Sequence, residues 1–352
     1  MSSSPRHILI CRNDNIGDVV LTLPITTWLK ARFPSAKISM MVRGYAAAVP
    51  RACATVDEVV EAESVEADPV KYFRQSGIDT VIFAQPDGAL NRKLAKSAFF
   101  ARVPNRIGNA RQKLYMAIYC NRRVRFSKRE MAAHESQFNF EFLRRFGLER
   151  IPALDEIAGM VQWKAMRDAQ VDALLAPHGF NLVVHPKSNG HGREWPAAYF
   201  SALADQLAEH PAVRIWVTGS AKEGEWLQQH APGLLQRPNV SNLCGQLSLS
   251  QLMCLIRSAD GLIASGTGPL HLSAALGQRT LGLYPPTRPM HPERWAPVGP
   301  RASYLCVPES CPDCARLQTP SCACMEKILP ETVAARVLEW MAQVSRPLVA
   351  SA

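Results

Sequence analysis

The sequence has no apolar run long enough to cross a membrane. A spanning helix needs about 18 to 20 consecutive apolar residues, and no stretch of the 352 residues approaches that length. The first residues, MSSSPRHILIC, lack the long apolar core of a secretory signal peptide and pass directly into a strand-like segment. We therefore expect a cytoplasmic protein.

Signatures of nucleic-acid-binding domains are absent too. The sequence contains no zinc-finger, basic-zipper or RNA-recognition pattern, and the G-x-G-x-x-G fingerprint of dinucleotide-binding folds is missing. The formal net charge is nevertheless +10, from 40 Lys and Arg against 30 Asp and Glu. This balance favours anionic partners such as nucleotides, phosphorylated lipids or a membrane face, and we expect no nucleic acid.

Basic residues are densest between Arg92 and Arg129, in a stretch that is poor in acidic residues. One interpretation is a solvated helical face, and the other is a patch that binds an anionic acceptor or a membrane surface. The members of this basic stretch are Arg92, Lys93, Lys96, Arg102, Arg106, Arg111, Lys113, Arg122, Arg123, Arg125, Lys128 and Arg129.

Short apolar segments alternate with amphipathic segments in two rounds along the chain, a pattern typical of parallel sheets covered by helices. The predicted strands are 7–11, 37–42, 56–60 and 80–84 in the first round, and 181–184, 214–218, 262–264 and 280–284 in the second. The predicted helices include 19–32, 135–147, 197–207, 250–258, 269–276 and 331–344.

The length and the two rounds predict an α/β protein with two Rossmann-like domains that face a central cleft. We place the boundaries at residues 1–165 for the N-terminal domain, 166–330 for the C-terminal domain, and 331–352 for a terminal helix and tail. Ligands in such sheets bind at the carboxyl ends of the strands, so the loops there carry the functional predictions.

Residues 181–196, NLVVHPKSNGHGREWP, combine a strand, a polar loop and the start of a helix. Loop amides, the helix dipole and the side chains of Lys187 and Arg193 could all point at a phosphate. An ordinary strand-to-helix connection with solvated charges explains the same residues.

The loop after the first strand leads through Gly17 to Asp18. Asp18 is either the N-cap of the following helix or a carboxylate that takes a proton from a hydroxyl group. Two later loops have the same ambiguity. Glu223 follows a strand end and is either a ribose contact or a helix-start acid. His271 follows the glycines of SGTGPLHL and is either near an anion site or a packing residue.

Four segments together resemble glycosyltransferase family 9, the ADP-heptose:lipopolysaccharide heptosyltransferases. Their order and spacing carry the resemblance, which spans nearly the whole chain. The segments are ILICRNDNIGDVVLTLPITTWLKARFPSAKISMMV, like the family's first strand, GD loop and helix; HESQFNFEFLRRFGL, like the stretch before its interdomain linker; HPKSNGHGREWP, like its phosphate loop; and SGTGPLHLSAALG with LGLYPPT, like its donor-binding signature.

The resemblance implies a GT-B fold and an inverting transfer of a heptose or related sugar from an ADP-activated donor to a lipopolysaccharide core acceptor. It implies no cofactor and no catalytic metal. The acceptor, a lipid-anchored glycan, would bind the N-terminal domain, so the enzyme would work peripherally on the inner face of the cytoplasmic membrane. By position, Asp18 matches the general base of the family. The residues that match its donor contacts are Lys187, Ser188, Arg193, Glu223, Thr267, Gly268, Leu270 and His271.

We assign acceptor binding to Arg122, Arg123 and Arg125 in the basic stretch. One position departs from the family pattern, because many members carry Asp where this chain has Gly266. The loss of that carboxylate leaves the identity of the sugar open, and keeps as an alternative a catalytically idle GT-B-like module that binds a nucleotide or anionic glycolipid. A nicotinamide oxidoreductase is disfavoured by the missing glycine fingerprint.

Half of the ten cysteines lie between residues 306 and 324. Cys311-x-x-Cys314 followed by Cys322-x-Cys324 approximates a four-thiolate metal site, with the second pair one residue tighter than usual. Unmodified thiols in a turn-rich loop are the other interpretation, and a disulfide is disfavoured in a cytosolic enzyme.

Overall fold

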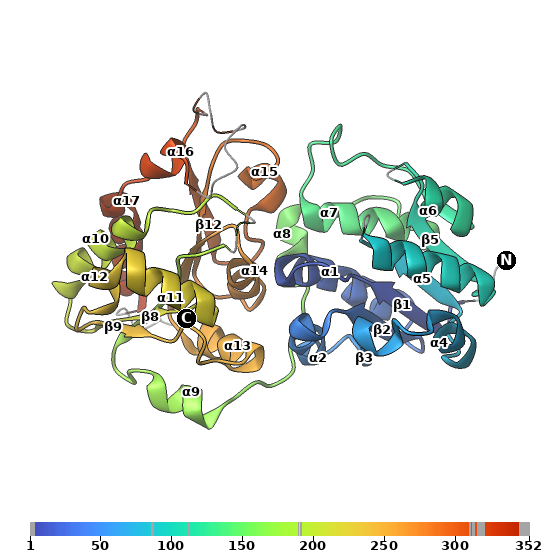
Figure 1. The fold of residues 1–352 in the computed structure, drawn as a ribbon, viewed down its shortest axis with the longest axis horizontal. Helices are drawn as coiled ribbons and strands as arrows, with labels where there is room; N and C mark the ends of the chain where they lie inside the picture. The colour runs from blue at the N-terminus through green and yellow to red at the C-terminus, as the bar shows by residue number, and fades with distance from the viewer. Residues whose placement is uncertain are drawn as a thin grey trace, which may run out of the picture. The chain divides into compact units, whose positions relative to one another are not determined.

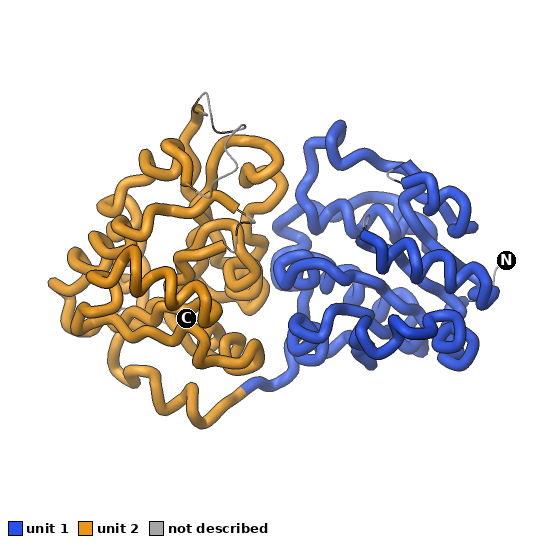
Figure 2. The backbone as a smooth tube through the Cα atoms, in the orientation of Figure 1, with its two compact units in different colours: residues 1–166 blue, residues 167–352 orange. Residues whose placement is uncertain are grey.

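The structure is a computed structural model that describes residues 4–344 except 86–87, 112, 189, 191, 310, 312–313 and 315–320. The chain forms two compact units, residues 1–166 and 167–352 (Figures 1 and 2). Each unit contains one six-stranded parallel sheet with helices packed around it. None of the described helices is both long enough and apolar enough to span a bilayer.

The sheet of unit 1 has the strand order β3-β2-β1-β4-β5-β6. Its strands are β1 (His7–Cys11), β2 (Lys37–Val42), β3 (Glu58–Glu61), β4 (Thr80–Phe83), β5 (Asn105–Asn109) and β6 (Arg122–Val124). Its helices are α1 (Ile16–Arg32), α2 (Ala48–Ala52), α3 (Ala62–Val65), α4 (Pro69–Gln75), α5 (Ala89–Phe100), α6 (Leu114–Tyr119), α7 (Glu135–Phe140) and α8 (Leu154–Ile157), with 3-10 turns at Gly44–Ala46 and Glu141–Phe146.

The sheet of unit 2 has the order β12-β11-β10-β7-β8-β9. Its strands are β7 (Phe180–His185), β8 (Val213–Val217), β9 (Val240–Asn242), β10 (Gly261–Ser265), β11 (Thr280–Tyr284) and β12 (Ala302–Cys306). Its helices are α9 (Ala169–Leu174), α10 (Ala197–Ala208), α11 (Ala221–His230), α12 (Pro232–Leu235), α13 (Leu249–Ser258), α14 (Gly268–Ala275), α15 (Pro292–Trp295), α16 (Ala323–Glu326) and α17 (Pro330–Val344).

Both sheets have the same topology, the doubly wound order of Rossmann folds. The strand order reverses between β1 and β4 in unit 1 and between β7 and β10 in unit 2. At such a switch point the loops that leave the two strands diverge and open a crevice at the carboxyl ends. The loops after β1 and β4, and after β7 and β10, are therefore the places where each unit can hold a ligand.

The central strands were predictable because both faces of a parallel sheet are buried. Ile8, Leu9 and Ile10 of β1 are fully buried, and every residue of β7 and β10 is buried. The predicted central strands are confirmed to within one or two residues. Four strands were missed, namely β5, β6, β9 and β12. Three of these are edge strands, which bury less side-chain surface and so lack a continuous apolar run.

The basic stretch is not one helical face, so that interpretation is wrong. Its basic residues are distributed over α5, β5, β6 and the segments that connect or follow these elements. In unit 2 the terminal helix α17 packs against α10, and the ring of Trp340 lies against Gly261 of β10.

Candidate functional site

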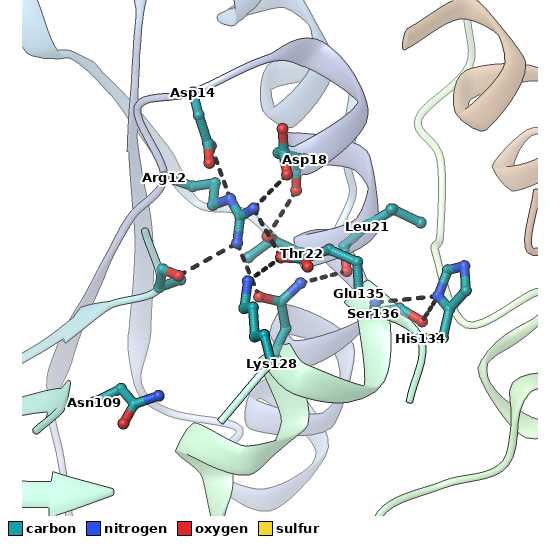
Figure 3. A network of polar contacts seen from close by, with 12 residues as sticks. Arg12, Asp14, Asp18, Leu21, Thr22, Asn109, Lys128, His134, Glu135 and Ser136 are labelled. Carbon is teal, nitrogen blue, oxygen red and sulfur yellow. Dashed lines mark hydrogen bonds and ion pairs between the residues drawn. The ribbon is translucent and has the colours of Figure 1, made fainter. Parts of the chain in front are cut away.

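A buried arginine occupies the switch point of unit 1. Arg12 is the first residue after β1 and is only 1% exposed. Its guanidinium group contacts three carboxylates: Nε donates to Asp14 Oδ1 at 2.8 Å, and Nη2 donates to Asp18 Oδ1 at 2.5 Å and to Glu135 Oε1 at 3.1 Å. Figure 3 shows these groups converging from the β1 loop, from α1 and from α7.

Neutral groups complete the surroundings of Arg12. Its Nη1 donates to the carbonyl oxygen of Ala84, just after β4, at 3.3 Å, and to Asn139 Oδ1 at 3.1 Å. Asn139 Nδ2 in turn donates to the Leu21 carbonyl of α1 at 2.9 Å. Arg12 therefore joins both loops of the switch point to α1 and α7.

The network contains more negative than positive charge. Lys128 Nζ also pairs with Glu135 Oε1, so two cations face the three carboxylates of Asp14, Asp18 and Glu135. The pKa of Asp14 is raised to about 6. Burial is the largest cause of this shift, and the charge of Arg12 and its hydrogen bond act in the opposite direction.

Asp18 is not an N-cap, so that alternative is wrong. The N-cap of α1 is Asn15, and Asp18 lies in the first helical turn. Its side chain is 12% exposed and is held by Arg12. Next to it, Asn13 is 8% exposed, and its side-chain amide atoms have no hydrogen-bond partner among the described residues. Unpaired buried amide groups cost free energy, so Asn13 is suited to bind a ligand group.

The loop after β7 forms the corresponding site in unit 2. Lys187 Nζ pairs with Glu194 Oε2 at 2.5 Å, and it also lies 3.5 Å from the centre of the Trp226 ring. The backbone N–H and the hydroxyl of Ser188 donate to Glu194 Oε1 at 2.8 and 3.0 Å. Glu194, which is 9% exposed, therefore gathers two of the predicted donor-binding residues.

Arg193 lies in the same loop and is 6% exposed. Its Nη2 donates to the carbonyl oxygen of Cys314 at 2.8 Å. Two residues further on, Trp195 Nε1 donates to the carbonyl oxygen of Ile328 at 2.7 Å. The loop after β7 is thus anchored to the segment that carries the cysteine cluster.

The loop after β10 lies against the loop after β7. The N–H of Trp195 donates to Ser265 Oγ at 3.2 Å, and a β-carbon placed on Gly192 would lie 3.3 Å from the Gly266 carbonyl oxygen. Thr267 is the N-cap of α14 but makes no side-chain cap bond. Its hydroxyl oxygen is buried and has no hydrogen-bond partner among the described residues, so it is available to a ligand.

The other predicted donor contacts have structural roles of their own. Gly268 and Leu270 lie in the first turn of α14, and His271, 4% exposed, follows them. Glu223 forms a capping box with Ser220: its Oε2 accepts from the Ser220 N–H at 2.7 Å and from the hydroxyl at 2.9 Å. The helix-start interpretation of Glu223 is therefore correct, whereas its contact with ribose stays a prediction.

The predicted acceptor residues lie on and just after β6. Arg122 is half-buried, and Arg123 and Arg125 are exposed. Arg123 and Arg125 line a pocket of about 620 Å³ together with Arg144, Arg145 and Glu141. This pocket is strongly cationic, as an acceptor with phosphate groups would require.

A comparison with protein families decides the classification of the chain. Residues 85–323, more than half of the 352, match the model of glycosyltransferase family 9 (heptosyltransferase). The chain belongs to glycosyltransferase family 9. It is a glycosyltransferase, as the four sequence segments predicted.

Individual relatives agree with this membership. The chain is 22% identical over 302 residues to lipooligosaccharide heptosyltransferase 2 of Haemophilus influenzae, covering 81% of this chain and 85% of that one. It is 27% identical over 311 residues to lipopolysaccharide heptosyltransferase 1 of Pseudomonas aeruginosa, covering 80% and 79%. The structure of Escherichia coli ADP-heptose lps heptosyltransferase II superposes with a TM-score of 0.74 at 18% identity, covering 97% and 100%. The α/β fold of GT-B type is thereby confirmed.

Several residues that build these two sites in the family 9 enzyme were missed by the sequence analysis. Arg12 and Asp14 were passed over as ordinary loop residues. A charged residue directly after a buried strand is the signal that could have drawn attention to Arg12. Glu135 and Lys128 are far from Arg12 in the sequence and gave no local signal. Glu194 could have been found as the acid inside a basic loop.

The raised pKa of Asp14 predicts the sign of a pH effect on stability. The folded protein binds a proton at Asp14 more tightly than the unfolded chain, whose carboxyl has a pKa near 3.8. The contribution of Asp14 to the stability of the wild type should therefore fall as pH rises from about 4 to 6. Asp14→Asn removes this titration, so the variant should gain stability relative to wild type between pH 4 and pH 7, measured by chemical denaturation at each pH.

Asp57→Asn is the matched control, because the pKa of Asp57 is lowered. Burial is the largest single cause and raises this pKa, but the hydrogen bonds from Lys30 and the Ile38 N–H, together with the charges of Lys30 and Lys37, lower it further than burial raises it. Here the wild-type carboxylate contributes stability above its unfolded pKa, so this variant should lose stability relative to wild type as pH rises. Parallel pH curves for wild type and Asp14→Asn would show that Asp14 ionises in the folded protein as it does in the unfolded chain.

Proposed function

We propose that this family 9 enzyme transfers a heptose or a related sugar from an ADP-activated donor to a lipopolysaccharide core acceptor, with inversion at the anomeric carbon. The observation that carries the proposal is the division of charge between two Rossmann switch points. One has an excess of carboxylates around Arg12, and the other has Lys187, Ser188 and Arg193 beside the unpaired hydroxyl of Thr267. The names of the relatives, which are heptosyltransferases of lipooligosaccharide and lipopolysaccharide, support the substrate class.

The donor diphosphate is assigned to unit 2. Lys187 and Arg193 would stabilise the negative charge that develops on the leaving ADP. The buried Thr267 hydroxyl and the amides at the start of α14 add hydrogen-bond donors. Glu194 compensates Lys187 before the donor binds. Gly268, Leu270 and His271 would line the same loop, and the ribose is assigned to Glu223.

The base is assigned to Asp18 in unit 1, the N-terminal acceptor-binding domain of this proposal. The acceptor hydroxyl oxygen attacks the anomeric carbon while its proton passes to Asp18. The bond from the anomeric carbon to the phosphate oxygen breaks, and its electron pair leaves with ADP. Arg12 binds Asp18 Oδ1 and fixes its direction, so we assign Oδ2 to the hydroxyl proton.

Asp14 is the second candidate for the base. Its pKa of about 6 is closer to neutrality than that of an ordinary carboxyl, as suits general-base catalysis. Asp14 Oδ1 is also held by Arg12, at 2.8 Å. Both aspartates accept a hydrogen bond from the guanidinium group of Arg12, so the turnover of their variants is needed to decide which of them is the base.

Replacing Asp18 with Asn should lower turnover by about 10² to 10⁴, because the variant cannot accept a proton from the acceptor hydroxyl. Release of ADP from ADP-heptose in the presence of acceptor measures this rate, and calorimetry should find ADP affinity unchanged. Asp14→Asn is the paired variant, which should keep most of the turnover. Loss of turnover in Asp14→Asn with near-normal turnover in Asp18→Asn would assign the base to Asp14. Saturable binding of ADP-heptose without any ADP release by wild type would favour an idle binding module.

Replacing Lys187 or Arg193 with Ala should weaken binding of ADP-heptose by about 1.5 to 3 kcal/mol for each charged hydrogen bond lost, roughly ten- to a hundredfold in Kd. Isothermal calorimetry with ADP and ADP-heptose measures this change. Arg214→Ala is the control, because Arg214 is exposed. It lies near the amino end of β8, whereas the donor loops leave the carboxyl ends of the strands. Unchanged Kd values in both loop variants would remove this loop from the donor site.

Attachment to the inner face of the cytoplasmic membrane is supported by a surface of unit 1 that is both basic and apolar. Four large apolar side chains on α5 and α6 are exposed: Leu114 (78%), Ile118 (57%), Phe100 (53%) and Phe99 (40%). The two helices pack together, and the rings of Phe99 and Tyr119 are 5.7 Å apart between centroids.

Cations surround these rings. Lys96 Nζ lies 5.9 Å from the centre of the Phe100 ring, and the Arg106 guanidinium lies 5.4 Å from that of Phe99. Aromatic side chains flanked by Lys and Arg are typical of proteins that bind at the bilayer interface. We name Phe99, Phe100, Leu114 and Ile118 with their flanking cations the α5–α6 surface.

The protein should sediment with anionic vesicles, and salt should weaken this binding. Each Lys or Arg near an anionic surface contributes about 1 kcal/mol, and the Debye length falls from about 10 Å at 0.1 M salt to about 3 Å at 1 M. Reversal of Arg122, Arg123 and Arg125 to Glu should reduce binding, as should Leu114→Ser with Ile118→Ser.

Reversal of the exposed Arg167, Arg214 and Arg257 of unit 2 is the control with the same change of charge. Binding that is indifferent to salt, lipid charge and the unit 1 variants would leave the basic stretch as solvated surface.

A further inference from the structure

We propose that Cys311, Cys314, Cys322 and Cys324 together bind one divalent metal ion, with zinc as the expected occupant, as a structural site of unit 2. The four side chains offer one sulfur each. The site is separate from the sugar-transfer chemistry, and its occupancy does not depend on the function proposed above.

The sulfur positions have the dimensions of a tetrathiolate site. All four Sγ atoms lie within 4.8 Å of one another. Two neighbouring pairs are separated by 3.6 Å (Cys311 and Cys322) and 3.1 Å (Cys314 and Cys322). A tetrahedral zinc ion with Zn–S bonds of about 2.3 Å separates its sulfur ligands by roughly 3.8 Å. A disulfide would bring two sulfurs to about 2.05 Å, and none of the ten cysteines, all of which are described, forms one.

The local backbone supports this grouping. The N–H of Cys314 donates to the Cys311 carbonyl at 3.1 Å. The N–H of Cys311 donates to Cys324 Sγ at 3.0 Å. Cys322 is the N-cap of α16, and Cys324 lies within that short helix. Two tight local structures therefore present their sulfurs to a common point.

The site is closed, as structural metal sites are. Cys314 and Cys324 are fully buried, Cys322 is 3% exposed, and Cys311 is half-buried. Sulfur ligands in a tetrahedral set select zinc or iron over oxygen-seeking ions such as magnesium and calcium. With four protein ligands no coordination position is left for a substrate, so the ion would act by holding the segment folded.

The segment that the ion would hold also positions the loop after β7. The Cys314 carbonyl accepts the 2.8 Å hydrogen bond from Arg193, and the Ile328 carbonyl accepts that from Trp195. Loss of the ion would disturb the carbonyl group of Cys314, which accepts a hydrogen bond from Arg193. This consequence for donor binding rests on the proposed function, whereas the metal site does not.

The first test is the metal content of the full-length protein, purified without chelators and measured by inductively coupled plasma mass spectrometry. We expect one zinc ion per chain, with X-ray absorption showing four sulfur ligands at about 2.3 Å. Iron at the same stoichiometry with the same ligands would support the site and change the ion. A folded protein without bound zinc or iron after growth in metal-supplemented medium would overturn the proposal.

The second test uses Cys311→Ser, because Cys311 is the least buried of the four ligands. This variant should lose the ion and melt at a lower temperature. Cys306→Ser and Cys244→Ser are controls in the same unit that should keep it, since neither residue belongs to the cluster. If Cys311→Ser does not fold, a mercurial reagent added to wild type should release one ion per chain to a chromogenic chelator. Retention of metal by Cys311→Ser would also overturn the assignment.

The third measurement separates the metal site from its effect on Arg193. Wild type stripped of metal should bind ADP about tenfold more weakly, as expected for one misplaced charged hydrogen bond, and readdition of zinc should restore binding. Unchanged ADP affinity with loss of zinc would keep the metal site and remove the coupling. Absence of ADP binding in the zinc-loaded protein would contradict the proposed function and leave the metal site standing.

Discussion

The site of unit 1 depends on the burial of one guanidinium group. Removing an ion from water costs several kcal/mol even after relaxation, so a buried arginine needs charged partners with good geometry. Arg12 finds three of them, in the loop after β1, in α1 and in α7. Because these partners come from separate elements, the ion pairs fix α1 and α7 against the switch point. The carboxylates are oriented by the same contacts, so the ion pairs that stabilise this part of unit 1 also fix the geometry of the site.

In unit 2 the charged groups at the switch point are cations, and they too are held by partners within the unit. A loop that binds a diphosphate must present cations, and it must not leave them uncompensated when the donor is absent. Lys187 is paired with Glu194 and stacked on Trp226, and Arg193 is bonded to a backbone carbonyl. A carbonyl is a weaker partner for a cation than a phosphate. On the proposed function, Lys187 would share its charge between Glu194 and a bound donor.

The sequence could predict a feature where the residues that indicate it lie close together along the chain. Most of the buried parallel strands were found because both of their faces are apolar. Three of the edge strands, β6, β9 and β12, were missed because they lack a continuous apolar run, and the internal strand β5 was missed as well. The loop after β7, which we propose binds the donor, was predicted from strand, loop and helix signals that lie within 16 residues. The partners of Asp18 could not be found in this way, because Glu135 and Lys128 approach Arg12 only through the fold. The cysteine spacing correctly grouped four sulfurs, but their burial depends on the packing of unit 2.

The departure at Gly266 has a packing explanation that also limits where sugar recognition can occur. A β-carbon at this position would lie 3.0 Å from the ring carbon Cε1 of Tyr284, which is tighter than ordinary contact. Tyr284 is 1% exposed, and its hydroxyl donates to the Trp295 carbonyl, so its ring has little freedom to move. A side chain at 266 would therefore require the Tyr284 ring to shift by a few tenths of an ångström, which its buried hydrogen bond opposes. On the proposed function, the aromatic ring would occupy the space next to the donor loop, and hydroxyl groups of the sugar would bind other residues.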